Sequence, residues 1–393
     1  MNQFNMEERR RYISEEFNKR YGRLPSIWAR APGRVDLMGS HTDYNMGFVM
    51  TMTIDRDTWI AARPREDNQV AIYSCNVPGG ALFSLEDIQR DEAVPWTNYV
   101  RGVAAEMQAS GYKLRGFDGL VHSTIPFGSG LSSSAAIEMA TALLFKTLSG
   151  LELDPVDMAL IGQKAENEFV GVSTGILDQY SSVMGRNGCA ILLDCRHLTS
   201  EVVRINPSLH VVICNTRAKR NLVGTEYDER RAQCEEGVRL LQRFYPEITA
   251  LRDVTPAMFE GQRRALPALI ARRCQFIIEE NQRVLDLAQA LPEGRPEPLH
   301  ALFAASYSGA LDLYEIGAPA MSAMMQAMST APGAVAARQA GAGFGGSMVA
   351  LVKGGFLEPF TEHVTKIYQQ ETKIQPEVDA VQAVPGAMIL DWV

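Results

Sequence analysis

Apolar and polar positions along the chain alternate between strand-like and helix-like patterns, which predicts an α/β or α+β fold. Two apolar-rich runs, at residues 26–35 and 48–64, have strand character and flank a polar stretch at 36–45. Four more short strands are predicted at residues 119–125, 188–195, 201–205 and 210–216. We therefore expect mixed sheets with helices on their faces.

Apolar residues at helical spacing mark the expected helices. The start of the chain is charged, and Ile13, Phe17 and Tyr21 recur four residues apart, which predicts an amphipathic helix. Asp154 and Pro155 are typical of an N-cap and a first helical residue. Further helices are predicted at residues 98–111, 132–150, 154–171, 227–245 and 268–291.

The length of the chain predicts two domains. A domain usually holds about 100–200 residues, and this chain has 393. Strands dominate just before and just after residue 200, so we place the boundary there. The prediction is an N-terminal domain at 1–200 and a C-terminal domain at 201–393.

Composition and charge narrow the classes of partner. The net charge of −8 disfavours a nucleic-acid partner, because proteins that bind nucleic acid are more often basic. No apolar run approaches the roughly 20 residues that span a bilayer, and the charged start lacks the core of a signal peptide. The six cysteines are scattered and form neither a C-x-x-C pair nor a zinc spacing. We expect a cytoplasmic protein with reduced cysteines and no membrane partner.

The stretch PFGSGLSSSAAIEMA, residues 126–140, predicts an anion site. Its glycines let backbone N–H groups approach a ligand, and the helix that follows presents its positive end. The Gly-Lys-Ser/Thr ending of a Walker A loop is absent. The alternative is a serine-rich helix cap without a ligand.

Two other segments carry candidate groups. QAGAGFGGSMVAL, residues 339–351, packs four glycines before a strand-like run, as either a ligand-contacting loop or a plain turn. Glu166 falls on a predicted helix, at the rim of the core or in a cleft. Asp178 begins another helix, where an acid is usually a cap or a first-turn anion.

Taken in order, these stretches resemble the GHMP kinases, a family of sugar and small-alcohol kinases. APGRVDLMGSHTDYN, PFGSGLSSSAA and GAGFGGSMVAL are similar to its three motifs. Galactokinases are the most similar branch, since residues 165–179, 215–236 and 251–260 also resemble theirs. The resemblance covers roughly residues 25–390 and implies a two-domain GHMP kinase fold with its active site in the interdomain cleft.

The resemblance also implies an activity and its residues. The reaction would be transfer of a phosphoryl group from ATP, with Mg²⁺, to the anomeric C1 hydroxyl of galactose. Such a transfer needs positioning and charge neutralisation more than covalent help. Asp178 would be the catalytic base, Arg34 would stand between the sugar and the phosphoryl group, and Ser134 and Glu166 would hold the metal.

The substrate residues carried over by motif form two sets. The sugar pocket would be lined by Ser40, His41, Thr42, Asp43, Gly175 and Tyr227. The nucleotide would be held by Ser74, Gly128, Ser129, Gly130, Leu131, Ser132, Ser133 and Ser134. The resemblance leaves the oligomeric state open between a monomer and a weak dimer.

The first motif departs from the galactokinase pattern at two positions. Galactokinases usually read GRxNLIGEHTDYN, whereas this chain has Asp36 for the Asn and Ser40 for the Glu that normally faces the C6 hydroxyl. Three substrates are therefore left open. They are galactose, with Ser40 or water in place of the Glu carboxylate, arabinose, which lacks a C6 hydroxyl, and galacturonate, which carries a C6 carboxylate. A fourth alternative is a sensor that binds galactose and ATP without turnover.

Overall fold

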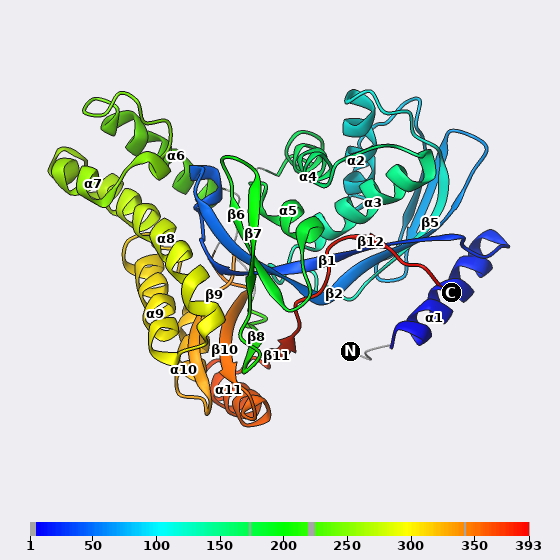
Figure 1. Cartoon of the computed structure of the whole chain (residues 1–393). Helices are drawn as coiled ribbons and strands as arrows, with labels where there is room; N and C mark the ends of the chain where they lie inside the picture. Colours follow the sequence, from blue (N-terminus) through cyan, green and yellow to red (C-terminus); the bar gives the residue numbers. More distant parts are fainter. Residues whose placement is uncertain (1–4, 173, 219–224, 342, 393) are drawn as a thin grey trace.

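Two β-sheets with helices on their faces form the frame of the molecule (Figure 1). The computed structural model describes residues 5–172, 174–218, 225–341 and 343–392. Residues 219–224, which belong to one of the galactokinase-like segments, therefore lie outside the described part of the chain.

The larger sheet has the order β12-β1-β2-β5-β3-β4, and β6 and β7 extend it from the other end of β2. Only the β3–β5 pair is parallel among its described pairs. Its strands are β1 (Ile27–Met38), β2 (Phe48–Pro64), β3 (Gln69–Ser74), β4 (Gly80–Ser84), β5 (Phe117–Ser123), β6 (Cys189–Asp194), β7 (Thr199–Arg204) and β12 (Met388–Ile389).

The smaller sheet is antiparallel and has the order β11-β8-β10-β9. Its strands are β8 (Leu209–Asn215), β9 (Ala334–Gln339), β10 (Ser347–Lys353) and β11 (Glu377–Val381). Its two faces contribute to separate cores, because side chains alternate along each strand. Ile213 packs toward the larger sheet, whereas Val212 packs under α10 and α11.

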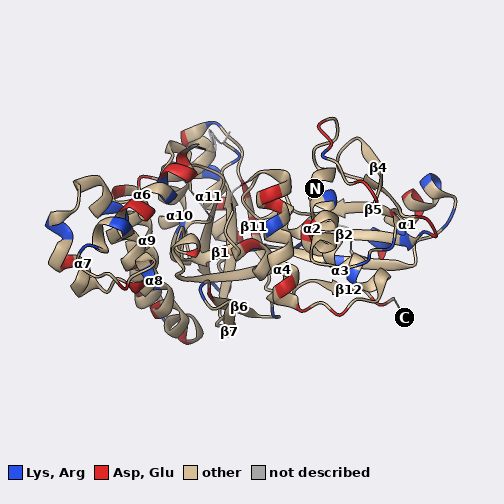
Figure 2. Ribbon diagram, turned by 90° about the horizontal axis from the view of Figure 1, so that it is seen from above, with Lys and Arg blue, Asp and Glu red and all other residues tan. Residues whose placement is uncertain are grey.

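The helices group by region (Figures 1 and 2). In the first half of the chain they are α1 (Met6–Tyr21), α2 (Thr97–Ala109), α3 (Ser133–Ser149), α4 (Pro155–Lys164) and α5 (Leu177–Met184). In the second half they are α6 (Thr225–Leu241), α7 (Pro256–Gln262), α8 (Ala268–Glu293), α9 (Pro296–Asp312), α10 (Pro319–Ser329) and α11 (Leu357–Thr372). Seen from above, α6 to α9 lie at one end of the molecule and α1 and β4 at the other (Figure 2). Among the residues that the structure describes, no helix is long and apolar enough to cross a membrane.

Strands β1 and β2 are buried on both faces of the larger sheet. Ala29 and Ile60 pack against α2 to α5, whereas Trp28 and Trp59 face α1 and the C-terminal segment. Trp28 packs edge-on against both Trp59 and Trp392, at centroid distances of 6.2 and 5.9 Å. The last segment of the chain, red in Figure 1, thus closes this face by adding β12 beside β1.

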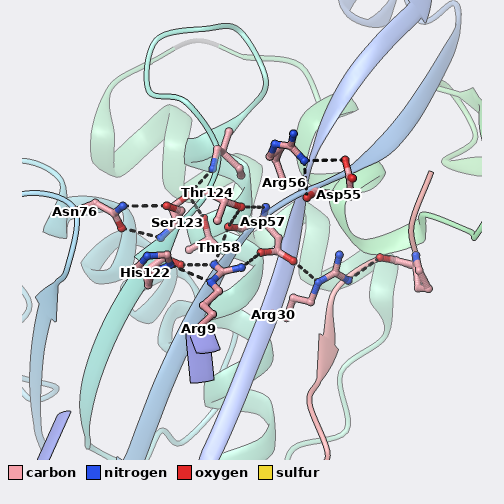
Figure 3. Close-up of polar contacts among 12 residues, drawn as sticks. Arg9, Arg30, Asp55, Arg56, Asp57, Thr58, Asn76, His122, Ser123 and Thr124 are labelled. Atoms are coloured by element: carbon pink, nitrogen blue, oxygen red, sulfur yellow. Dashed lines mark hydrogen bonds and ion pairs between the residues drawn. The ribbon is translucent and has the colours of Figure 1, made fainter. Parts of the chain in front are cut away.

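A buried ion cluster joins α1 to the same sheet (Figure 3). The Asp57 carboxylate accepts from Arg9 through one oxygen and from Arg30 through the other. Arg9 also donates to His122 Nδ1 at 2.9 Å, and Arg30 donates to the Pro385 carbonyl at 3.1 Å. Burial alone would raise the pKa of Asp57, but the two guanidinium groups hold it below its usual value.

Most predicted elements are confirmed, and the differences have physical causes. The strand predicted at 48–64 is β2 itself, and the Asp154 side chain caps α4 by accepting from Val156 N. The helix predicted at 154–171 was wrong as one α-helix, because α4 ends at Lys164 and a π-helical turn, Ala165–Val170, follows. Such turns are often found at functional sites. Strand β7 spans residue 200 and pairs with β6 in the larger sheet, and the division into two domains at 200 stays a prediction.

Candidate active site

A cavity of about 570 Å³ opens where the C-terminal end of β1, the start of α3 and the start of α5 meet. Of the residues predicted from the sequence, those that line it are Arg34, Ser40, His41, Asp43, Gly128, Gly130, Leu131, Ser132, Ser133, Ser134, Glu166, Gly175, Asp178 and Tyr227. The fold therefore brings both predicted sets, sugar and nucleotide, into one space.

Arg34 and Asp178 form the central ion pair of the cavity. Arg34 Nε donates to Asp178 Oδ1 at 2.9 Å, and Nη2 contacts the same oxygen. Arg34 Nη1 donates to the Gly130 carbonyl at 2.7 Å, and the Ser132 hydroxyl donates to Asp178 Oδ2. Asp178 lies in the first turn of α5, but its carboxylate makes these contacts and does not cap the helix. Asp178 is therefore a first-turn acid of α5 whose carboxylate is also held by Arg34 and Ser132.

The loop before α3 has the backbone of an anion-binding loop. Gly128 and Gly130 have φ values of +72° and +81°, which side-chain-bearing residues rarely adopt. Ser132 is also left-handed, at φ 58°, and leads directly into α3. The positive end of a 17-residue helix is thus directed at the cavity.

Glu166 is held in place by neutral donors. Its Oε2 accepts from Thr174 Oγ1 at 2.8 Å and from Gln179 Nε2 at 2.9 Å, and the Ser134 hydroxyl also contacts it. Burial and the nearby charge of Asp178 raise the pKa of Glu166, and these hydrogen bonds oppose the rise. A nearby cation would therefore stabilise the ionised form of the Glu166 carboxylate.

The cavity wall has an excess of negative charge. Its acidic residues within the described part of the chain are Asp36, Asp43, Glu166, Asp178 and Asp228. Arg34 is the one Lys or Arg residue among the same lining residues. A polyphosphate entering this space therefore needs a cation to accompany it.

The other end of the cavity is aromatic and polar. His41 Nδ1 is 2.8 Å from the Tyr44 hydroxyl, and the rings of His41 and Tyr227 lie 5.3 Å apart. A Cβ atom on Gly175 would stand 1.9 Å from Asp43 Oδ2. Only glycine at 175 lets the Asp43 carboxylate reach this position.

Ser40 makes contacts that the sequence did not indicate. Its hydroxyl donates to the Gly341 carbonyl at 3.0 Å and accepts from Arg338 Nη2 at 2.7 Å. Arg338 is fully buried beside Glu280, so Ser40 links the first motif to the third. The hydroxyl proton of Ser40 is thus engaged within the protein.

Three predicted residues do not line the cavity. Thr42 Oγ1 donates to the Gly39 and Phe48 carbonyls, which shapes the turn of the first motif. Ser129 Oγ donates to the Pro126 carbonyl, and Ser74 Oγ accepts from Asn76 N at the end of β3. Each of these side chains is engaged with its local backbone, and their assignment to the sugar and nucleotide sites stays a prediction.

The sequence reasoning missed several lining residues. Asp36, Tyr99, Thr174 and Gly341 also line the cavity and were not assigned to it. Asp36 and Gly341 lie inside the recognised motifs, so position alone was a usable signal. Thr174 lies inside the galactokinase-like segment 165–179, so the same signal was present for it. Tyr99 carried no such signal, because it comes from α2.

Comparisons with known proteins agree with this geometry. The family described as the galactokinase galactose-binding signature matches residues 15–64, and the GHMP kinases N terminal domain matches residues 98–186. Galactokinases of Roseiflexus sp. (strain RS-1) and Chloroflexus aurantiacus (strain ATCC 29366 / DSM 635 / J-10-fl) are each 40% identical over 92% of this chain and 92% and 93% of their own lengths.

Solved structures give the same picture. Lactococcus lactis galactokinase complexed with galactose superposes with a TM-score of 0.91 at 31% identity, covering 96% of this chain and 99% of that one. The Methanococcus jannaschii mevalonate kinase, at 17% identity and a TM-score of 0.60, covers 91% of this chain and 98% of its own, and shares the fold.

Proposed function

Because the chain belongs to the galactokinases, a branch of the GHMP kinase family, and is a sugar kinase that uses ATP, we propose that it phosphorylates the C1 hydroxyl of galactose. One observation carries the proposal. The Arg34–Asp178 pair and the N-terminal end of α3 face the same cavity, next to the residues of the first motif.

In the proposed reaction Asp178 accepts or orients the proton of the C1 hydroxyl. The C1 oxygen forms a bond to the γ-phosphorus of ATP, the bond from that phosphorus to the bridging oxygen breaks, and ADP leaves. Arg34 lies against Asp178 and holds positive charge where the transferred group becomes most negative. The side chains of Arg34 and Asp178 are oriented before substrate binds. Arg34 Nη1 donates to the Gly130 carbonyl, and Asp178 Oδ2 accepts from the Ser132 hydroxyl.

The residues at the start of α3 would bind the phosphates. Backbone N–H groups of Gly128 to Ser134 lie at a helix N-terminus, and Ser133 and Ser134 line the cavity. This supports the nucleotide assignment for the loop. Ser129 would contribute through its backbone N–H, because its side chain donates to the Pro126 carbonyl, and Ser74 lies at the end of β3 outside the residues that line the cavity.

Mg²⁺ fits the residues at the same end of the cavity. Glu166 supplies a hard carboxylate and Ser134 a hydroxyl, which suits an ion that keeps several waters and takes few protein ligands. The acid-rich wall gives a cation a further reason to accompany ATP. When bound, the ion would neutralise phosphate charge during the transfer.

Glu166→Ala should raise the magnesium concentration needed for half-maximal activity about tenfold or more. In the variant the ion loses one carboxylate ligand, while the ATP phosphates still bind it. Titration of activity with Mg²⁺ at fixed ATP measures the shift. Glu168→Ala, an exposed acid on the same turn, is the control, and an unchanged magnesium response in Glu166→Ala would remove the assignment.

The first-motif end of the cavity would bind the sugar. His41, Asp43 and Tyr227 offer donors and acceptors in fixed positions, as sugar hydroxyls require. Gly175 would act by leaving room for Asp43. Thr42 would shape the turn without touching the sugar.

Sugar utilisation should weaken in acid because of Asp43. Burial, with a smaller contribution from the charges of Asp178 and Asp36, raises the pKa of Asp43 to about 6. Below that pH the carboxyl group is protonated and loses acceptor strength. We expect kcat/KM for the sugar to fall by up to about tenfold per pH unit below pH 6. In Asp43→Asn this decline should be absent, and a wild-type profile that is flat between pH 5 and 7 would contradict the role.

Release of ADP against a panel of sugars tests the proposed function. The panel is galactose, galacturonate, arabinose, glucose and N-acetylgalactosamine, each with magnesium and ATP. Galactose should be the best substrate. The acid-rich wall of the cavity, which has Arg34 as the one Lys or Arg among its lining residues, disfavours the carboxylate of galacturonate. Binding of galactose without ADP release would indicate a sensor and overturn the proposal.

A further inference from the structure

Asp36 is a buried carboxylate of the cavity wall that receives no hydrogen bond from any described residue. Its Oδ1 is 3.0 Å from Arg34 Nε, but that N–H donates to Asp178 instead. Oδ1 is therefore buried without a hydrogen-bond partner. Buried polar atoms in this state are rare, because each lost hydrogen bond costs stability.

The second carboxylate oxygen of Asp36, Oδ2, lies on the side of Gly341. A Cβ atom built on Gly341 would lie 3.8 Å from Asp36 Oδ2 and 3.9 Å from the Gly130 carbonyl oxygen, with nothing closer. Gly341 lines the cavity on that side as Asp36 does on the other. A ligand atom can therefore enter between them.

The position of Asp36 along β1 relates it to the reacting end. Residues two apart on a strand point to the same face, with Cα atoms about 7 Å apart. Asp36 thus follows Arg34 along one face of the strand, and its Oδ1 lies 3.0 Å from Arg34 Nε, directly beside the group that adjoins Asp178.

We infer that Asp36 binds the sugar by accepting a hydrogen bond from a hydroxyl other than the one that is phosphorylated. This inference rests on the proposed sugar kinase function. Asp36, and not Ser40, would supply the specificity of this wall. Ser40 has its proton on the Gly341 carbonyl and accepts from Arg338, whereas Asp36 Oδ2, on the side of Gly341, receives no hydrogen bond from a described residue.

The test compares galactose with its 2-, 3-, 4- and 6-deoxy analogues in wild type, Asp36→Asn and Asp36→Leu. In wild type, removal of the contacted hydroxyl should lower kcat/KM by about ten- to hundredfold. In the Asp36 variants, galactose should lose that advantage over the same one analogue, while its advantage over the other analogues persists. Calorimetric binding of the sugars without ATP gives a second readout that does not require turnover.

Ser40→Ala is the matched control, and it should retain the wild-type preference among the analogues. An equal loss on every sugar in both Asp36 variants would overturn the inference, because it would mean that Asp36 only positions Arg34. Failure of wild type to release ADP with galactose would count against the proposed function instead. In that case the role of Asp36 is decided by calorimetry. The probes are whichever sugar of the panel binds and the deoxy analogues of that sugar.

Discussion

Asp178→Asn should lower turnover at least about a thousandfold while sugar affinity stays within about tenfold. The amide has nearly the shape of the carboxylate, so the cavity should keep its outline. It has no negative charge, so it neither accepts the hydroxyl proton nor pairs with Arg34, which contacts Asp178 through Nε and Nη2. Steady-state ADP release and calorimetric sugar binding measure the two quantities separately.

The control for this variant is Asp157→Asn, an exposed acid on α4 that does not line the cavity. Near-normal turnover by Asp178→Asn would show that Asp178 is neither base nor orienting group. A parallel loss of sugar binding by more than a hundredfold would make Asp178 a binding residue, and the kinetic loss would then say little about catalysis.

Asp57→Ala should lower the free energy of unfolding by about 3–5 kcal/mol. Asp57 is the shared partner of Arg9 and Arg30, both of which are buried. Removing the carboxylate leaves two guanidinium groups close together with no anion between them. Urea unfolding measures the loss. Because Arg9 belongs to α1, we also expect α1 to detach first, seen as faster proteolysis near the N-terminal end.

An exposed ion pair provides the comparison. Glu66 pairs with Arg115 at 2.8 Å, but its side chain is 95% exposed. Glu66→Ala should therefore change stability by less than about 1 kcal/mol. If Asp57→Ala cost no more than Glu66→Ala, the buried cluster would contribute nothing beyond an ordinary surface pair.

The elements that sequence reasoning located best are those whose own residues decide their structure. The strand β2 has an apolar run bounded by Gly47 and Pro64, and α4 begins at an Asp-Pro pair, so local signals fixed both. The π-helical turn after α4 has no comparable signal in its own residues. It carries Glu166, which lines a cavity that segments distant in sequence complete.

The same distinction applies to the site. Motifs predicted Arg34, Asp178 and the loop before α3, and all of them contribute to the lining of the cavity. Ser40 shows where motifs stop being sufficient. Its neighbours Arg338 and Gly341 are some 300 positions away in sequence, and only the packing of the first and third motifs shows where the hydroxyl proton is donated.

The pairing of β12 with β1 has a consequence for how the protein is made. Ala29 pairs with Ile389, so β1 has no β12 beside it until the chain between these two positions has been synthesised. At about 5–20 residues per second, a ribosome needs roughly 20–70 s to extend the chain between these two positions. During that interval the edge of β1 lacks its partner strand, and Trp28 lacks the cover of Trp392. The nascent chain is therefore most open to edge-to-edge aggregation before its final segment emerges.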